Sequence, residues 1–127
     1  MKRQLILTLF LLFFTLSLGL LCESGSRRIA NRFQSDMLSV ATSMAEDNLD
    51  AALRTAESIY ADWQKKSRVV QLWVNHADID HVTESLLDLR AALMAKDFSS
   101  ALSAYARCVE NFGHLHHRDA FTLRNLL

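Results

Sequence analysis

The sequence contains no proline and only three glycines, at positions 19, 25 and 113, in 127 residues. Tight hairpins and strand turns depend on these two residue types, so their scarcity argues against a β-sheet. The chain also has no net charge, with 14 basic and 14 acidic residues, and therefore has no uncompensated basic face that could bind phosphate. We expect an all-α protein that does not bind nucleic acid.

Cysteine is also scarce. Cys22 and Cys108 are too few for a disulfide framework, and Cys108 falls on an apolar helical stripe, which predicts a buried free thiol. The chain has no glycine-rich phosphate loop, no nucleophile elbow and no C-x-x-C pair. The sequence therefore predicts neither an enzyme nor a cofactor.

The longest feature that is present is an uncharged apolar run at residues 5–22, LILTLFLLFFTLSLGLLC, which follows Lys2 and Arg3. A helix of this length reaches about 27 Å, close to the hydrocarbon thickness of a bilayer. We predict a signal anchor that stays attached and contacts membrane lipid through residues 5–22. The alternative is a cleaved secretory signal, but Leu20 and Leu21 interrupt the small residues that such a cleavage site needs.

Charges on the two sides of this run leave the orientation nearly balanced. Lys2 and Arg3 precede it, and Arg27, Arg28 and Arg32 follow it, whereas positive charge marks the cytoplasmic side. A very short basic start before an apolar span is typical of an export signal. We therefore predict a single-pass protein of the cell membrane whose C-terminal domain is extracytoplasmic.

The rest of the chain is long enough for one small domain. We divide the sequence into an anchor at residues 1–22, a short linker at residues 23–26 that contains Gly25, and a helical domain at residues 27–127. The first helix of this domain carries apolar residues at spacings of three and four, namely Ile29, Phe33, Met37, Val40 and Met44.

Two similar segments mark the starts of later helices. Asn48 and Asp97 each stand where a helix cap is expected, and NLDAAL from Asn48 matches DFSSAL from Asp97 in its pattern. The second helix is expected to end near residues 64–67 and the third to cover residues 68–95, with Leu72 on its apolar stripe. No strong breaker separates the two helices, so a kink in place of a full turn is the alternative. The expected fold is a transmembrane helix followed by a small antiparallel four-helix bundle of two hairpins.

A polar cluster forms when the last hairpin is closed at its turn. His76 then lies level with His116 and His117, and Asp80 lies one helical turn after His76. His114 and His117 are also neighbours on one helix face. A metal site of His76, Asp80 and His116 or His117 is therefore geometrically feasible, although the spacing matches no H-E-x-x-H helix.

Two other interpretations of the cluster remain open. In the first, His76 is a histidine at the edge of the core that forms a hydrogen bond with a carboxylate or backbone group. In the second, the histidines form a pH-responsive link with Asp78, Asp80 or Glu84, since imidazole changes charge near neutrality.

Several short motifs resemble a bacterial membrane-protein family known as domain of unknown function 4363. The resemblance covers nearly the whole chain and begins with the basic start and single apolar span. The matching residues are Trp73, His76, Ile79 and Asp80, then Asp97, Phe98, Ala101 and Leu102, then Thr122, Leu123, Asn125, Leu126 and Leu127. Relatives carry a glutamate-rich lead into the closing segment, where this chain has His114, His116, His117 and Asp119. The resemblance implies a membrane location and a helical architecture, and no activity.

The function predicted from the sequence is that of an extracytoplasmic structural or protein-interaction module, held at the membrane, that binds a partner protein or itself. The alternative is a metal- or pH-sensing helical domain that uses His76 and Asp80 with His114, His116 and His117.

Overall fold

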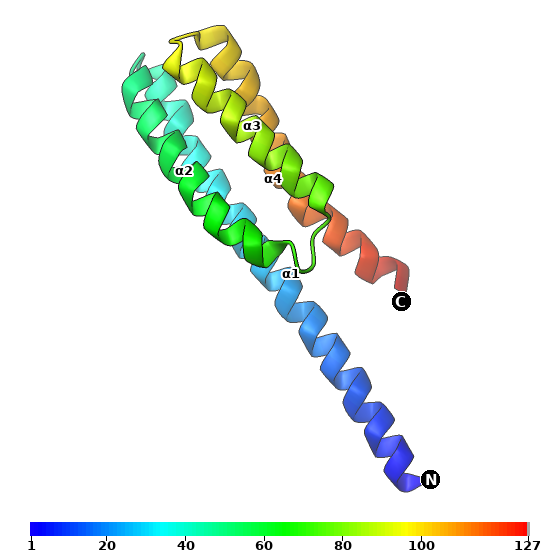
Figure 1. Cartoon of the computed structure of the whole chain (residues 1–127). Helices are drawn as coiled ribbons and strands as arrows, with labels where there is room; N and C mark the ends of the chain where they lie inside the picture. The colour runs from blue at the N-terminus through cyan, green and yellow to red at the C-terminus, as the bar shows by residue number, and fades with distance from the viewer. Residues whose placement is uncertain (127) are drawn as a thin grey trace.

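The computed structural model consists of four helices, α1 (Lys2–Ala45), α2 (Leu49–Val70), α3 (His76–Met94) and α4 (Phe98–Leu126) (Figure 1). It describes the backbone of residues 1–126, and the side chains of this part except those of residue 26 and residues 116–126. Helix dominates and no strand occurs within residues 1–126, which confirms the all-α prediction.

Helix α1 is a single rod of 44 residues. It passes through residues 23–26 without interruption, so the break expected there is absent, although the division into anchor and bundle stays a prediction. One glycine costs a helix only about 1 kcal/mol, and the surrounding residues supply no further breaker. Arg27 instead pairs with Glu23 across this segment at 3.4 Å, an i, i+4 contact that supports the helix. The apolar run and the first helix of the bundle are therefore parts of one uninterrupted helix.

The helices run alternately up and down, and each packs against its neighbours in sequence. The backbones lie close between α1 and α2, α2 and α3, α3 and α4, and α4 and α1, while the backbones of the diagonal pairs stay apart in the part of the chain described. This is the square arrangement of a four-helix bundle. The N-terminal part of α1 extends beyond it (Figure 1).

Three aromatic rings from three helices meet at the centre of the bundle. The Phe33 and Phe112 rings stack at 4.7 Å between centroids, and the Trp63 ring meets both edge-on at 5.7 and 5.5 Å. The indole Nε1 of Trp63 donates a hydrogen bond of 3.0 Å to Thr83 Oγ1, which satisfies its polar group inside the core. The aromatic cluster thus ties α1, α2 and α4 together and α3 joins through Thr83.

The turns after α1 and α3 have the same backbone geometry. Asp47 and Lys96 both adopt positive φ, at 57° and 54°. The following amides of Asn48 and Asp97 each donate to a carbonyl five residues back, at 2.9 and 3.0 Å, the bond of a Schellman motif. The side chains of Asn48 and Asp97 then accept from the amides three residues on, each at 3.1 Å. Both predicted caps and the similarity of the two hairpins are confirmed.

The boundary between the second and third helices was predicted wrongly. Helix α2 continues past residues 64–67 to Val70, and α3 starts only at His76. The predicted end is helical because no breaker stands there and Lys66 pairs with Asp62 at 2.8 Å within the helix. Asn75, which the sequence reading missed, caps α3 by accepting from the Ala77 amide at 3.1 Å. Leu72 therefore lies in a loop and is 77% exposed instead of packed.

Candidate functional site

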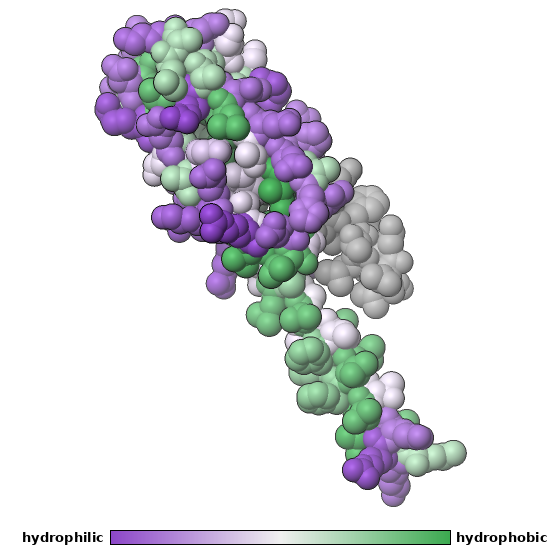
Figure 2. All heavy atoms as spheres, viewed as in Figure 1, coloured by the Kyte–Doolittle hydropathy of each residue, from purple (hydrophilic) through white to green (hydrophobic). Residues whose placement is uncertain are grey.

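The most distinctive surface is the free part of α1. Its large apolar side chains between residues 5 and 21 are all exposed, on every side of the helix. Helix α1 is the one helix in the described chain that is long and apolar enough to cross a membrane, and its apolar window buries nothing against the rest of the protein. Figure 2 shows this rod as mostly hydrophobic, with a hydrophilic tip, emerging from a bundle whose visible face is largely hydrophilic.

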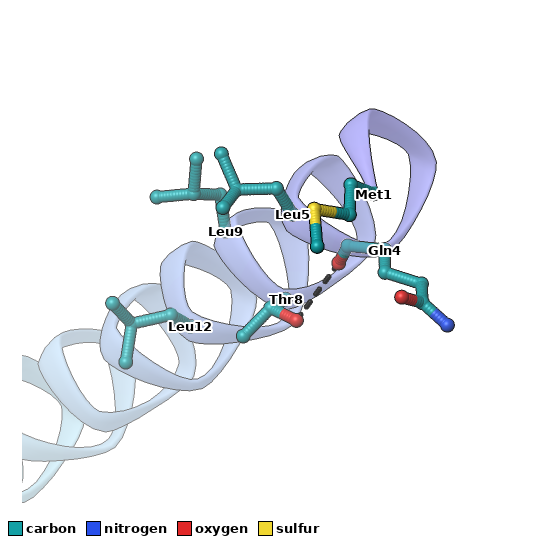
Figure 3. A pocket seen from close by; sticks show the side chains of 6 residues that line it. All are labelled: Met1, Gln4, Leu5, Thr8, Leu9 and Leu12. Atoms are coloured by element: carbon teal, nitrogen blue, oxygen red, sulfur yellow. Dashed lines mark hydrogen bonds between the residues drawn. The ribbon is translucent and has the colours of Figure 1, made fainter.

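A shallow hollow near the start of this rod is not an enclosed ligand site. Its lining comes from one helix alone, as Figure 3 shows, and consists of Met1, Gln4, Leu5, Thr8, Leu9 and Leu12. The Thr8 hydroxyl donates to the Gln4 carbonyl at 2.8 Å, so its polar group is satisfied within the helix. This local bond allows a threonine to face an apolar medium at low cost. The hollow is a groove between side chains of one helix.

A polar groove of about 280 Å³ lies between α3 and α4. Arg107 pairs with Asp88 across it at 3.1 Å, and the Asn111 amide donates to the His81 carbonyl at 3.0 Å. These contacts confirm the antiparallel register predicted for the last hairpin. The groove is lined by His81, Glu84, Ser85, Asp88, Arg107, Glu110, Asn111 and His114. Its volume is slightly smaller than that of a typical small-molecule pocket, which encloses about 300 Å³ or more.

The predicted metal set is only partly covered by the structure. His76 and Asp80 lie at the start of α3 and both are exposed. His76 is thus not at the edge of the core, because α3 begins at this residue and does not bury its first turn there. The side chains of His116 and His117 lie outside the described residues. Among the side chains that are described, no three histidine, cysteine or acidic groups gather closely enough to hold a metal ion. The four-residue set stays a prediction.

The structure brings together two histidines that the sequence reading did not pair. His81 and His114 line the same groove, together with Glu84 and Glu110. The signal that could have found them is the hairpin register, which applies to His81 as well as to His76. The prediction centred on His76 because His116 and His117 lie across the hairpin from it.

Cys108 is a buried structural thiol. It is fully covered at the interface of α3 and α4, and burial raises the pKa of the thiol to about 11, although a hydrogen bond with Ser85 acts in the opposite direction. Reactive cysteines have a lowered pKa and partial exposure. Cys108 therefore serves packing, as predicted, and both cysteines are free.

A second charged hollow lies between α1 and α2 and includes Arg32, Asp36, Asp62 and Lys65. The hydrogen bond from Lys66 holds the pKa of the Asp62 carboxyl below its usual value. Opposite charges alternate around this hollow, so it offers no uniform field to a ligand of either sign. It is an open polar hollow at the interface of α1 and α2.

Comparison with protein families assigns the bundle. The model of the family described as domain of unknown function (DUF4363) matches residues 26–126. The chain belongs to this family. The DUF4363 match begins where the apolar run has ended and covers the bundle portion of all four helices. No curated protein and no solved structure matches the chain.

Proposed function

We propose that this DUF4363 protein is a single-pass membrane-anchored module whose bundle stands outside the cytoplasm and binds a partner protein or a second copy. The observation that carries the proposal is the exposure of the whole apolar run on a helix that continues into the bundle core. Water is a poor solvent for such a surface, at about 25 cal/mol for each Å² of apolar area. A bilayer is the environment that matches its length and its all-round apolarity.

The bundle supports a binding role more than a catalytic one. Its described polar hollows are lined by side chains on open helix surfaces, and the buried thiol of Cys108 has a raised pKa of about 11. Chemistry at a thiol needs the opposite shift. We therefore propose a binding role for the bundle without a catalytic step.

Exposed apolar residues at the end of the bundle away from the rod support contact with another protein. Phe98 and Leu102 lie one turn apart on α4 and are 45% and 53% exposed, and Met94 at the end of α3 is 59% exposed. Apolar and aromatic side chains of this kind are enriched at protein interfaces.

Site-specific photocrosslinking in intact cells tests the binding role. A photoreactive residue in place of Phe98 or Leu102 is expected to give a discrete adduct, either with a partner or with a second copy at twice the mass. Ser58, an exposed polar position on α2, provides the matched control. Adduct patterns at positions 98 and 102 that equal the pattern at position 58 would count against the proposal.

Protease treatment of intact cells tests the orientation. Trypsin added from outside is expected to cut the bundle after its exposed lysine and arginine residues, such as Arg54 and Lys96. Protection in intact cells, with cleavage only after permeabilisation, would place the bundle inside.

A further inference from the structure

The loop between α2 and α3, residues 71–75, lies at the end of the bundle from which the apolar rod emerges (Figure 1). The alignment of α1 with α2 shows which residues of α1 the loop lies beside. The Phe33 ring on α1 contacts the Trp63 ring and has the Lys66 ammonium 5.3 Å from its centre. Counting along the antiparallel pair from these two contacts puts Val70, the last residue of α2, level with residues 26–29 of α1, which include Arg27 and Arg28.

This height is within reach of a bilayer surface. If the hydrocarbon region ends near Cys22, Arg27 and Arg28 stand about 8 or 9 Å above it, at about 1.5 Å per helical residue. The headgroup region adds about 5 to 8 Å on each side of the hydrocarbon core. The loop extends from Val70 toward the rod, so its residues reach the headgroup region.

The loop presents apolar side chains outward from a fixed backbone. Val70 and Val74 are buried at 2% and 7% exposure, and they hold the loop against the bundle. Val69 and Leu72 point away from the core and are 55% and 77% exposed. Trp73, directly after Leu72, is half-buried and packs against the bundle core, and tryptophan is a residue type that concentrates at membrane interfaces.

Charge distinguishes this end of the bundle from the other. Arg27, Arg28 and Arg68 are exposed around the loop. The opposite end carries acidic residues at its two turns, where Asp47 and Asp50 lie beside Lys96 in a shared hollow. Acidic residues offset part of the basic charge, because Glu23 pairs with Arg27 at 3.4 Å and Asp78 and Asp80 lie near the start of α3. The arginines lie on α1 and α2, and the two aspartates lie on α3. Basic residues beside an apolar loop match the phosphate groups of lipids.

We infer that Val69 and Leu72 insert into the headgroup layer of the bilayer that α1 spans, with Trp73 at the edge of this layer and Arg28 and Arg68 facing lipid phosphates. The inference rests on the proposed membrane anchor and deepens it. The bundle then has two contacts with the membrane, the rod and the loop, which restrict its tilt and present the end with Phe98 and Leu102 away from the lipid.

Depth-dependent fluorescence quenching tests this contact in the full chain. The chain carries one cysteine at position 12, 72 or 102, in a background with Cys22→Ala and Cys108→Ala, and is labelled with an environment-sensitive dye. It is reconstituted into vesicles of phosphatidylcholine and phosphatidylglycerol, with and without brominated acyl chains. Position 12 reports the span, position 72 the loop, and position 102 the far end of the bundle.

The expected order is strong quenching at position 12, intermediate quenching at position 72 and almost none at position 102, with a several-fold difference between the last two. Quenching at position 72 that equals position 102, while position 12 stays quenched, overturns the loop contact and leaves the anchor in place. Absence of quenching at position 12 overturns both. A blue-shifted dye emission at position 72 that reddens when Arg28 and Arg68 are replaced by Gln supports the role of the two arginines, and unchanged emission contradicts it.

Discussion

The two halves of helix α1 belong to one uninterrupted rod and differ in what surrounds them. In the half that packs in the bundle, Phe33, Met37, Val40 and Met44 are buried while the residues between them are mostly exposed. In the free half, apolar residues occupy every side and none is buried. A helix with one apolar stripe packs that stripe against a protein core. A helix that is apolar on all sides requires an apolar environment all around it. The surroundings change along the helix while its backbone does not.

Arginine substitutions in the two halves give the largest expected difference. Replacement of Leu12 and Phe13 by Arg puts two charges at the centre of the span, at a cost of about 5 to 7 kcal/mol for insertion. The double variant is expected to leave the membrane fraction, as measured by immunoblotting after alkaline extraction. The matched control, Leu38→Arg with Ser39→Arg, changes two exposed positions in the bundle half and should stay in the membrane. Equal behaviour of the two variants would abolish the distinction between the halves.

Removal of the central indole tests the packed half. Trp63→Ala leaves a cavity beside Phe33 and Phe112 and should lower the free energy of unfolding by about 3 to 5 kcal/mol. Urea unfolding of the full chain in detergent micelles, followed by circular dichroism, measures the change. Trp63→Phe provides a milder second variant if the alanine variant does not fold. Leu72→Ala, at an exposed position, should change stability by about 0.5 kcal/mol or less. A similar loss for Trp63→Ala and Leu72→Ala would refute the core assignment.

The buried thiol of Cys108 makes the stability of the packed half depend on pH. Because burial raises its pKa from 9.0 to about 11, the folded state holds the thiol proton more tightly than the unfolded state. Its stabilising contribution is complete below pH 9 and is lost as the pH rises toward 11, a change of about 2 to 3 kcal/mol. Unfolding free energies measured across this range should fall more steeply for the native chain than for Cys108→Ala. Parallel curves would show that the thiol is not in a dry environment.

The turns that hold the bundle half in place give the smallest effect. Lys96 adopts positive φ without being glycine, so Lys96→Gly should stabilise the bundle by about 1 kcal/mol. Asp47→Gly should stabilise it less, because aspartate tolerates this conformation better than lysine. Lys96→Ala, which keeps the strain, serves as the control in thermal unfolding. A gain for the alanine variant as large as for the glycine variant would point to the loss of charge as the cause.

Periodicity and capping predicted most of this fold from the sequence. The stripe at Phe33 and Met37 and the caps at Asn48 and Asp97 were readable because each depends on nearby residues. The end of α2 was not, since Val70 and Val74 are buried by contacts with other helices and Leu72 in the same segment is not. Apolar residue type alone does not tell which of these three positions is buried. The groove with His81 and His114 was within reach through the hairpin register, whereas the predicted set with His116 and His117 stays untested.

The intact mass of the chain recovered from alkali-washed membranes tests the central claim most directly, namely that one helix is both membrane span and bundle member. The full 127-residue chain, of 14.4 kDa, is expected in the membrane pellet with residues 5–22 still attached. A shorter chain that begins beyond Cys22 and is found in the supernatant would contradict it.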